Sequence, residues 1–388
     1  MAVVHVFLSL VLVLSAWANT WGFAFAQASP PRDITDMFHI SFDANIPGNC
    51  ATHGKDQFTQ IIEDAFALSE AGLQAVMDSI DKDSKTRSEA DRLVSALFQN
   101  PSKSERSTIQ SMFENVRNFF KQEGPIINGK SLKKPYLFCG DSWRIREDMS
   151  SQMRDANGEL MKDEEGSPYY IKDNKQMKKR QKAAKEDWGF EKLRSIYPYW
   201  CPGLKAYMFD KKYSKDPMEG PCSSGVLGYT VFEVKTGIGA ITLCDASFIG
   251  GGLRTARCEP FADSSFLDNK QKRPKEKTTI KTVSPRATTF YHELFHLLWE
   301  KLMDPENGEE YKFSRMAGKE KRIVKIGKDE IEETFSKGQC LKNPHSYVYT
   351  AIAYDYTLNE KRVVKNKEGP GETVYPVEFY TGYATYHS

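Results

Sequence analysis

The chain has 388 residues, which is enough for one large or two medium domains with an ample hydrophobic core. Its 54 Lys and Arg residues nearly balance its 52 Asp and Glu residues, and a net charge of +2 gives no reason to expect a nucleic-acid or membrane partner. An apolar content of 40% and an aromatic content of 12% exclude an intrinsically disordered chain.

The N-terminus carries a short uncharged apolar run, VVHVFLSLVLVLSAWA, followed by small residues. This pattern is typical of a secretory signal peptide, and the run is shorter than the roughly 20 residues of a membrane-spanning helix. We expect a signal peptide over residues 1–26, with cleavage after Ala18 or Ala26 and an end between 18 and 28. The mature protein is then secreted and extracellular, without a membrane partner. An uncleaved membrane anchor is the alternative.

All the cysteines lie downstream of this segment. An oxidising compartment favours disulfide formation, so we expect up to three disulfides and one remaining thiol. The cysteines are Cys50, Cys139, Cys201, Cys222, Cys244, Cys258 and Cys340.

The first half of the chain is predicted to be mainly helical. Apolar residues at helical spacing predict a helix over 56–80, and amphipathic helices over 88–99 and 104–122. The stretch 134–143 predicts a short strand that ends in a turn. The highly charged stretch 145–192 is interpreted as a solvated surface insertion, with a partner-binding patch as the alternative.

The second half mixes strands and helices. The β-branched and aromatic content of 228–248 predicts a hairpin that turns at 235–239. A basic loop, 268–286, leads into an apolar helix. Two further helices are predicted over 329–337 and 343–360, the second with a proline in its first turn.

The last thirty residues are rich in Gly and Tyr and are predicted to be irregular. Because no repeat or linker is visible, we predict one domain over 27–388 with charged insertions near 145–192 and 268–286. The predicted fold class is α+β, mostly helical with a small antiparallel sheet.

The apolar helix contains the motif His-Glu-x-x-His, at His292, Glu293 and His296. Positions i and i+4 share one face of a helix, so both imidazoles can bind one zinc ion. Glu293 is then placed to act as the general base that takes a proton from water activated by the zinc, and afterwards as the acid that protonates the leaving amine. The alternative is two ordinary histidines in the core or on the surface of a helix.

A catalytic zinc site has a third protein ligand. The acidic side chains of the predicted helix 329–337 could reach the histidines, although each could equally belong to a solvated helix face. These residues are Asp329, Glu330, Glu332 and Glu333.

Four stretches resemble the deuterolysin-type (aspzincin) metalloendopeptidases and their relatives among secreted fungal proteins. They are LFCGDSW, GAITLCDASF, FYHELFHLL and CLKNPHSYVYTAIA, and only the zinc helix among them is specific. The last stretch resembles the family's Asn-Ala-Asp-Ser-Tyr helix. The resemblance implies a zincin-like fold and a monomeric endopeptidase with one zinc ion (Zn2+) and protein or peptide substrates.

The chain departs from this family at the third ligand, which the family takes from Gly-Thr-x-Asp-x-x-Tyr-Gly. Counting back from NPHSY places Ile323, which cannot bind zinc, at the aspartate position. Counting forward from His296 reaches Asp329 instead. We therefore predict Asp329 as the third ligand, with Glu320 and Glu330 as reserves.

Two alternatives stay open. One is a secreted zinc-binding or interaction protein, effector-like, that keeps the fold without hydrolysing peptides. The other is a gluzincin-like enzyme in which Glu332 or Glu333 supplies the third ligand.

Overall fold

The computed structural model describes most of the chain after the predicted signal peptide, which lies outside the described residues. The described residues are 31–121, 126–127, 130–131, 133–187, 195–233, 238–249, 274–299, 302, 312–319, 322–326, 329–333, 335–359, 361–365 and 372–386.

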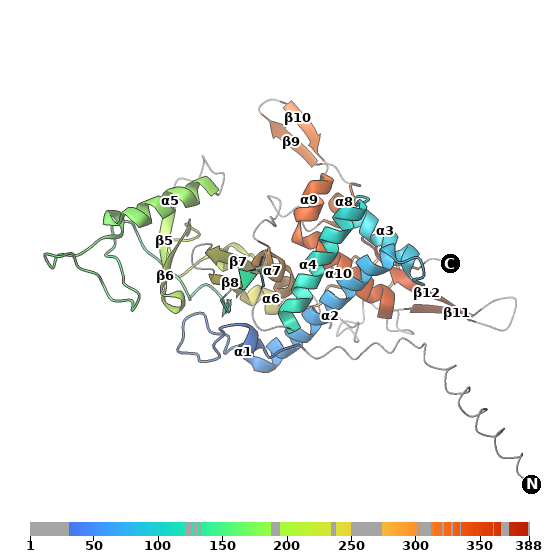
Figure 1. The fold of residues 1–388 in the computed structure, drawn as a ribbon, viewed down its shortest axis with the longest axis horizontal. Coiled ribbons are helices and arrows are strands. Elements are labelled where there is room, and N and C mark those ends of the chain that lie inside the picture. Colours follow the sequence, from blue (N-terminus) through green and yellow to red (C-terminus); the bar gives the residue numbers. More distant parts are fainter. Residues whose placement is uncertain are drawn as a thin grey trace, which may run out of the picture.

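A group of long helices forms the main body (Figure 1). The three helices predicted in the first half are confirmed as α2 (Gly54–Ile80), α3 (Arg87–Leu97) and α4 (Lys103–Lys121), and they follow a short α1 (Ile34–Met37). The predicted helix 343–360 is confirmed as α10 (Pro344–Asn359). It packs against α2, α3 and α7, so residues 344–357 are buried on every side, as expected of a helix without a polar face.

A mixed three-stranded sheet lies against this body. Its strand order is β3 (Tyr136–Cys139), β8 (Ile238–Leu243) and β7 (Gly228–Glu233). The predicted hairpin is confirmed because β7 pairs antiparallel with β8, although its turn, 234–237, lies outside the described residues. The small sheet was predicted to be antiparallel. This is wrong for one pair of strands, because β3 runs parallel to β8.

The His-Glu-x-x-His segment forms α7 (Thr288–Leu298), which contacts both β7 and β8. Its other neighbours are α2, α4 and α10, so the helix is enclosed between the sheet and the helical body. The short α6 (Asp245–Ile249) follows β8 directly.

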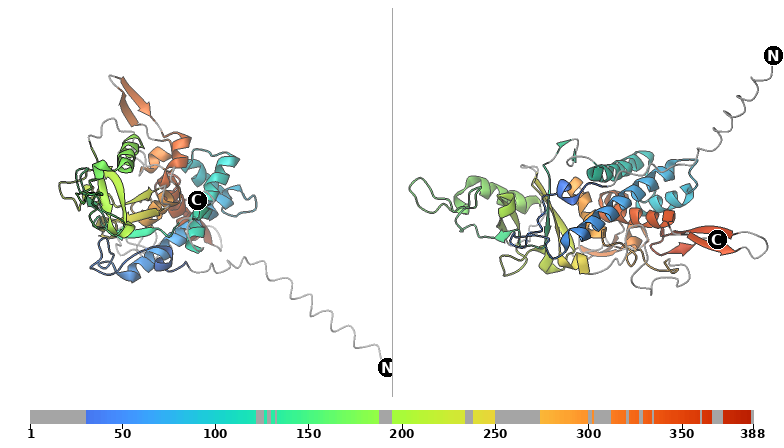
Figure 2. Two further views of the ribbon diagram at one scale, coloured as in Figure 1. Left: turned by 60° about the vertical axis from the view of Figure 1, so that its left-hand side comes forward. Right: turned by 90° about the horizontal axis from the view of Figure 1, so that it is seen from below.

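The charged stretch after β3 folds into a lobe that extends from the sheet (Figure 2). It contains the antiparallel strands β4 (Ile145–Arg146), β5 (Ile196–Cys201) and β6 (Ala206–Lys211), together with α5 (Lys175–Asp187). Short 3-10 turns occur at Ile171–Asp173, Pro202–Leu204 and Pro221–Ser224.

This lobe has its own small core of Met153, Ile171, Met177, Trp200 and Tyr207. The stretch predicted as a solvated insertion is therefore a folded unit.

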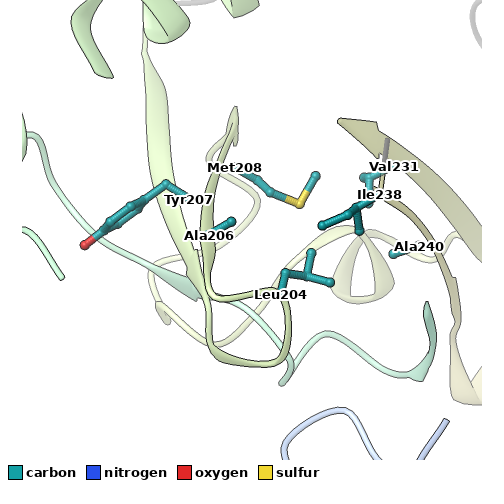
Figure 3. Close-up of a pocket in the computed structure, with 7 residues that line it drawn as sticks. All are labelled: Leu204, Ala206, Tyr207, Met208, Val231, Ile238 and Ala240. Atoms are coloured by element: carbon teal, nitrogen blue, oxygen red, sulfur yellow. The ribbon is translucent and has the colours of Figure 1, made fainter. Parts of the chain in front are cut away.

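An apolar cavity of about 10 Å³ lies between β6 and the β7–β8 hairpin. It is lined by Met208, Val231 and Ile238, among others (Figure 3). A space of this size holds at most one water molecule, so it is a packing gap and not a substrate site.

The chain after α7 differs from the predicted structure. The predicted helix 329–337 is wrong, because residues 329–333 form β10 (Asp329–Glu333), paired antiparallel with β9 (Arg322–Ile326). The partner strand β9 reads RIVKI, and its three β-branched residues favour β structure. The helix begins only at α9 (Lys337–Lys342), where Ser336 and Gln339 form a capping box. The one-turn helix α8 (Phe313–Met316) precedes the hairpin.

The prediction that the last thirty residues are irregular is wrong. They contain β11 (Lys361–Lys365), β12 (Glu372–Glu378) and β13 (Thr385–Tyr386), arranged in that order in one sheet. The valines and threonines in these strands favour β structure, and the prediction from the Gly and Tyr content did not take them into account. A separate small hairpin joins β1 (Ile126–Ile127) and β2 (Lys130–Ser131).

Two disulfides occur among the described residues, Cys50–Cys139 and Cys222–Cys244. Cys201 and Cys340 are free and buried, so two thiols remain where one was expected. Cys258 lies outside the described residues. No described helix is long and apolar enough to cross a membrane.

Candidate metal centre

The helix α7 brings the two motif histidines together, as their spacing predicts. The Nε2 atoms of His292 and His296 are 3.1 Å apart. Two imidazole nitrogens bound to one tetrahedral zinc lie about 3.3 Å apart, given Zn–N bonds of about 2.0–2.1 Å. The pair therefore has the separation that a shared metal ion requires.

The second ring nitrogen of His296 has a partner of the kind found around metal-binding histidines. Its Nδ1 lies 3.3 Å from the carbonyl oxygen of Leu302. When Nδ1–H donates to this carbonyl, Nε2 carries the lone pair and faces His292. The turn after α7 thus fixes the orientation of the His296 ring.

A third histidine, which the sequence reasoning did not select, lies beside the pair. His345 belongs to the first turn of α10, and its ring centre is 4.4 Å from that of His292. Its backbone N–H donates to the side chain of Asn343 at 2.9 Å, which fixes the start of the helix. The available signal was the NPHSY stretch, which has His where the resembled family has Asp.

Glu293 is buried beside the edge strand of the sheet. Its side-chain Oε2 accepts a hydrogen bond of 2.8 Å from the hydroxyl of Thr230 on β7. Successive residues of a strand point to opposite sides, so Thr230 faces α7 while Tyr229 and Val231 face the apolar cluster around Trp143.

The contact between α7 and β7 is close because β7 begins with a glycine. A Cβ atom at Gly228 would lie 2.9 Å from Cγ2 of Thr289 and 3.4 Å from Cγ of Glu293. The small residue lets the strand approach the helix, so the Thr230–Glu293 hydrogen bond can form.

The LFCGDSW stretch supports the sheet through Asp141. Asp141 accepts hydrogen bonds from the backbone N–H groups of Gly220 and Cys222, both 2.9 Å, and from the Tyr229 hydroxyl at 2.8 Å. Burial raises the pKa of the Tyr229 hydroxyl, so this group stays a donor. Asp141 therefore holds β7 in position from the side opposite α7.

The predicted acidic ligands belong to the segment around the β9–β10 hairpin. Asp329 pairs with Ile326 at the turn end of the β9–β10 hairpin, and this hairpin stands away from the helical body (Figures 1 and 2). Glu330, Glu332 and Glu333 follow on the same strand, and Glu320 lies outside the described residues. The assignment of Asp329 stays a prediction.

The described residues fit a zinc ion in part. The histidine pair supplies two converging nitrogen donors. Among the described residues, however, no group of three or more His, Cys, Asp and Glu side chains is arranged as a complete metal site. The motif therefore brings together two imidazole nitrogens, with the Glu293 carboxylate on the next residue.

The chain matches no family model, no curated protein and no solved structure. The resemblance to deuterolysin-type enzymes and the zincin-like fold remain predictions from the sequence, and the fold class that the described residues establish is α+β.

Proposed function

We propose that this protein is a zinc-dependent endopeptidase that is secreted and cleaves protein or peptide substrates. The observation that carries the proposal is the pair of Nε2 atoms 3.1 Å apart on a buried helix, with Glu293 next to the first histidine. His292 is buried and His296 is half-buried, so neither imidazole lies on an exposed helix face.

The residues of the motif have distinct tasks in this proposal. His292 and His296 would hold the zinc ion, which would supply Lewis-acid chemistry and make water more acidic. Glu293 takes a proton from the attacking water and delivers it to the nitrogen of the leaving amine. Thr230 holds the carboxylate in place through its hydrogen bond to Oε2.

The edge of the sheet suits an extended peptide. Within the described part of the chain, β7 pairs only with β8, so its outer edge offers backbone N–H and C=O groups. An extended substrate can add to such an edge as a further strand. Because Thr230 of β7 contacts Glu293, a peptide on this edge would pass close to the catalytic carboxylate.

Secretion is supported by the disulfides. Cys50–Cys139 and Cys222–Cys244 are bonds typical of oxidising compartments. Together with the predicted signal peptide, they favour an extracellular site of action.

The decisive test is Glu293→Gln, because glutamine keeps the shape of the side chain but cannot act as a base. We expect the variant to retain one zinc per chain by atomic absorption and to lose cleavage of an unfolded protein substrate by at least 100-fold, the scale of general-base catalysis. His292→Ala should lose both zinc and activity. Wild-type protein that contains no zinc after purification with added zinc would refute the proposal.

A second candidate function is zinc binding without hydrolysis. It is favoured by the lack of a complete three-ligand group among the described residues. Under this alternative, wild type and Glu293→Gln both bind zinc and show the same background cleavage on a broad peptide library.

A further inference from the structure

We propose that His345 is the third protein ligand of the metal, so that the site consists of His292, His296 and His345. This inference rests on the proposed zinc binding and identifies the ligand that the acidic segment does not supply. Three neutral imidazoles are one of the ligand sets of catalytic zinc, with the fourth position left for water or substrate.

Proximity is the first argument. Rings bound through Nε2 to one tetrahedral zinc have centres about 5 Å apart, given Zn–N bonds of about 2.0–2.1 Å. The ring centres of His292 and His296 are 4.9 Å apart, and those of His292 and His345 are 4.4 Å apart. The ring of His345 is thus already at the distance expected for a ligand that shares a metal with His292.

The rigidity of its support is the second argument. His345 is 6% exposed and sits on α10, which packs directly against α7. Tyr349, one turn further along α10, places its ring 5.4 Å from that of His345. Ligands carried by packed helices keep their positions better than ligands on loops, and an aspartate at the turn end of a hairpin lacks such support.

One adjustment is required. The donor atoms of the three histidines do not already surround one point, since the described residues contain no complete group of three ligands. The His345 ring must turn about its two side-chain torsions, while the backbone of α10 stays in place.

The chemical consequence is a site of higher positive charge. With an aspartate as third ligand, the metal and its ligands would carry one positive charge, whereas three neutral histidines leave both charges of the zinc uncompensated. A more positive centre favours deprotonation of water more strongly and binds the carboxylate of a product terminus more tightly.

The test measures zinc affinity by competition with a chromophoric chelator, independent of proteolysis. His345→Phe keeps an aromatic ring for packing but has no nitrogen donor. We expect it to lower zinc affinity by more than about 100-fold, beyond the roughly 10- to 100-fold that loss of an outer-shell partner costs. His39→Phe changes an exposed histidine whose ring packs at a tilt against Tyr136; it is the matched control and should bind like wild type. Asp329→Ala should also bind like wild type.

Zinc X-ray absorption of the wild-type protein gives a second measurement that does not depend on a variant. We expect three imidazole ligands per zinc. Two imidazoles, unchanged affinity in a folded His345→Phe variant, or loss of zinc in Asp329→Ala would each overturn the assignment of His345. If wild type binds zinc and His292→Ala does not, the three outcomes above reject only His345 as a ligand, and the proposed function stands. If wild type binds no zinc, both the proposed function and the assignment of His345 are refuted.

Discussion

At the residue scale, the chemistry of the site depends on a hydrogen bond that joins two elements. Glu293 belongs to α7 and Thr230 to β7, and 63 positions of sequence separate them. The same Thr230 hydroxyl lies 3.1 Å from the backbone carbonyl oxygen of Glu293. Under the proposed mechanism, Thr230 is therefore a positioning residue that sets the direction of the Glu293 carboxylate.

Thr230→Val removes this hydroxyl but keeps the size and β-branching of the side chain. A hydrogen bond to a charged group is worth about 1.5–3 kcal/mol, so we expect kcat to fall roughly 10- to 100-fold. KM and zinc content should stay unchanged, because the hydroxyl donates to Glu293 and not to the two motif histidines. Thr289→Val on α7 is the control, and an undiminished kcat in Thr230→Val would contradict the positioning role.

At the element scale, α7 is held by the helices behind it. The ring of Phe113 on α4 contacts Phe295 of α7 and Tyr347 of α10, with ring centres 6.0 and 5.5 Å apart. Phe113 reaches this position because α2 has a glycine at the crossing. A Cβ atom at Gly72 would lie 2.2 Å from Cε1 of Phe113, so no larger residue fits.

Gly72→Ala should destabilise the protein, although alanine favours a helix over glycine by about 0.8–1.0 kcal/mol. Overpacking against the Phe113 ring should outweigh this gain, and we expect the free energy of unfolding to fall by roughly 1–3 kcal/mol in denaturant titrations. Gly338→Ala in α9 is the control, since its nearest new contact is 3.9 Å away. Adding Phe113→Leu to Gly72→Ala should recover part of the loss, and a more stable single variant would refute the crowding argument.

At the scale of the whole molecule, the disulfides join segments that are distant in sequence. Cys50–Cys139 spans 89 positions and links the segment before α2 to the end of β3. Cys222–Cys244 spans 22 positions and links the loop before β7 to the end of β8. The first bond connects the helical body to the sheet, while the second acts within the sheet region.

Because the stabilisation by a disulfide grows with the loop it closes, the two bonds should differ. Replacing Cys50 and Cys139 by serine should lower the free energy of unfolding by about 4–5 kcal/mol, and replacing Cys222 and Cys244 by about 3 kcal/mol, on chain-entropy grounds. Denaturant titration of both double variants without reductant checks the order. A larger loss for the shorter loop would show that native contacts, and not chain entropy, dominate.

The sequence by itself determined the features that depend on local pattern. Apolar spacing located α2, α3, α4 and α10, the β-branched run located the β7–β8 hairpin, and the i, i+4 spacing placed His292 and His296 on one face of a helix. The prediction failed for β10, where preferences for helix and for strand compete. It also failed for β11 to β13, which lie in a segment rich in Gly and Tyr.

Only the tertiary structure decided which distant residues meet. The contact of His345 with His292, the bond from Thr230 to Glu293 and the pairing of Cys50 with Cys139 all join separate elements. Such contacts depend on how elements pack, and the periodicity within each element carries no information on its partner. The choice of third ligand therefore could not be read from spacing alone, because it depends on which helix or strand the fold brings beside α7.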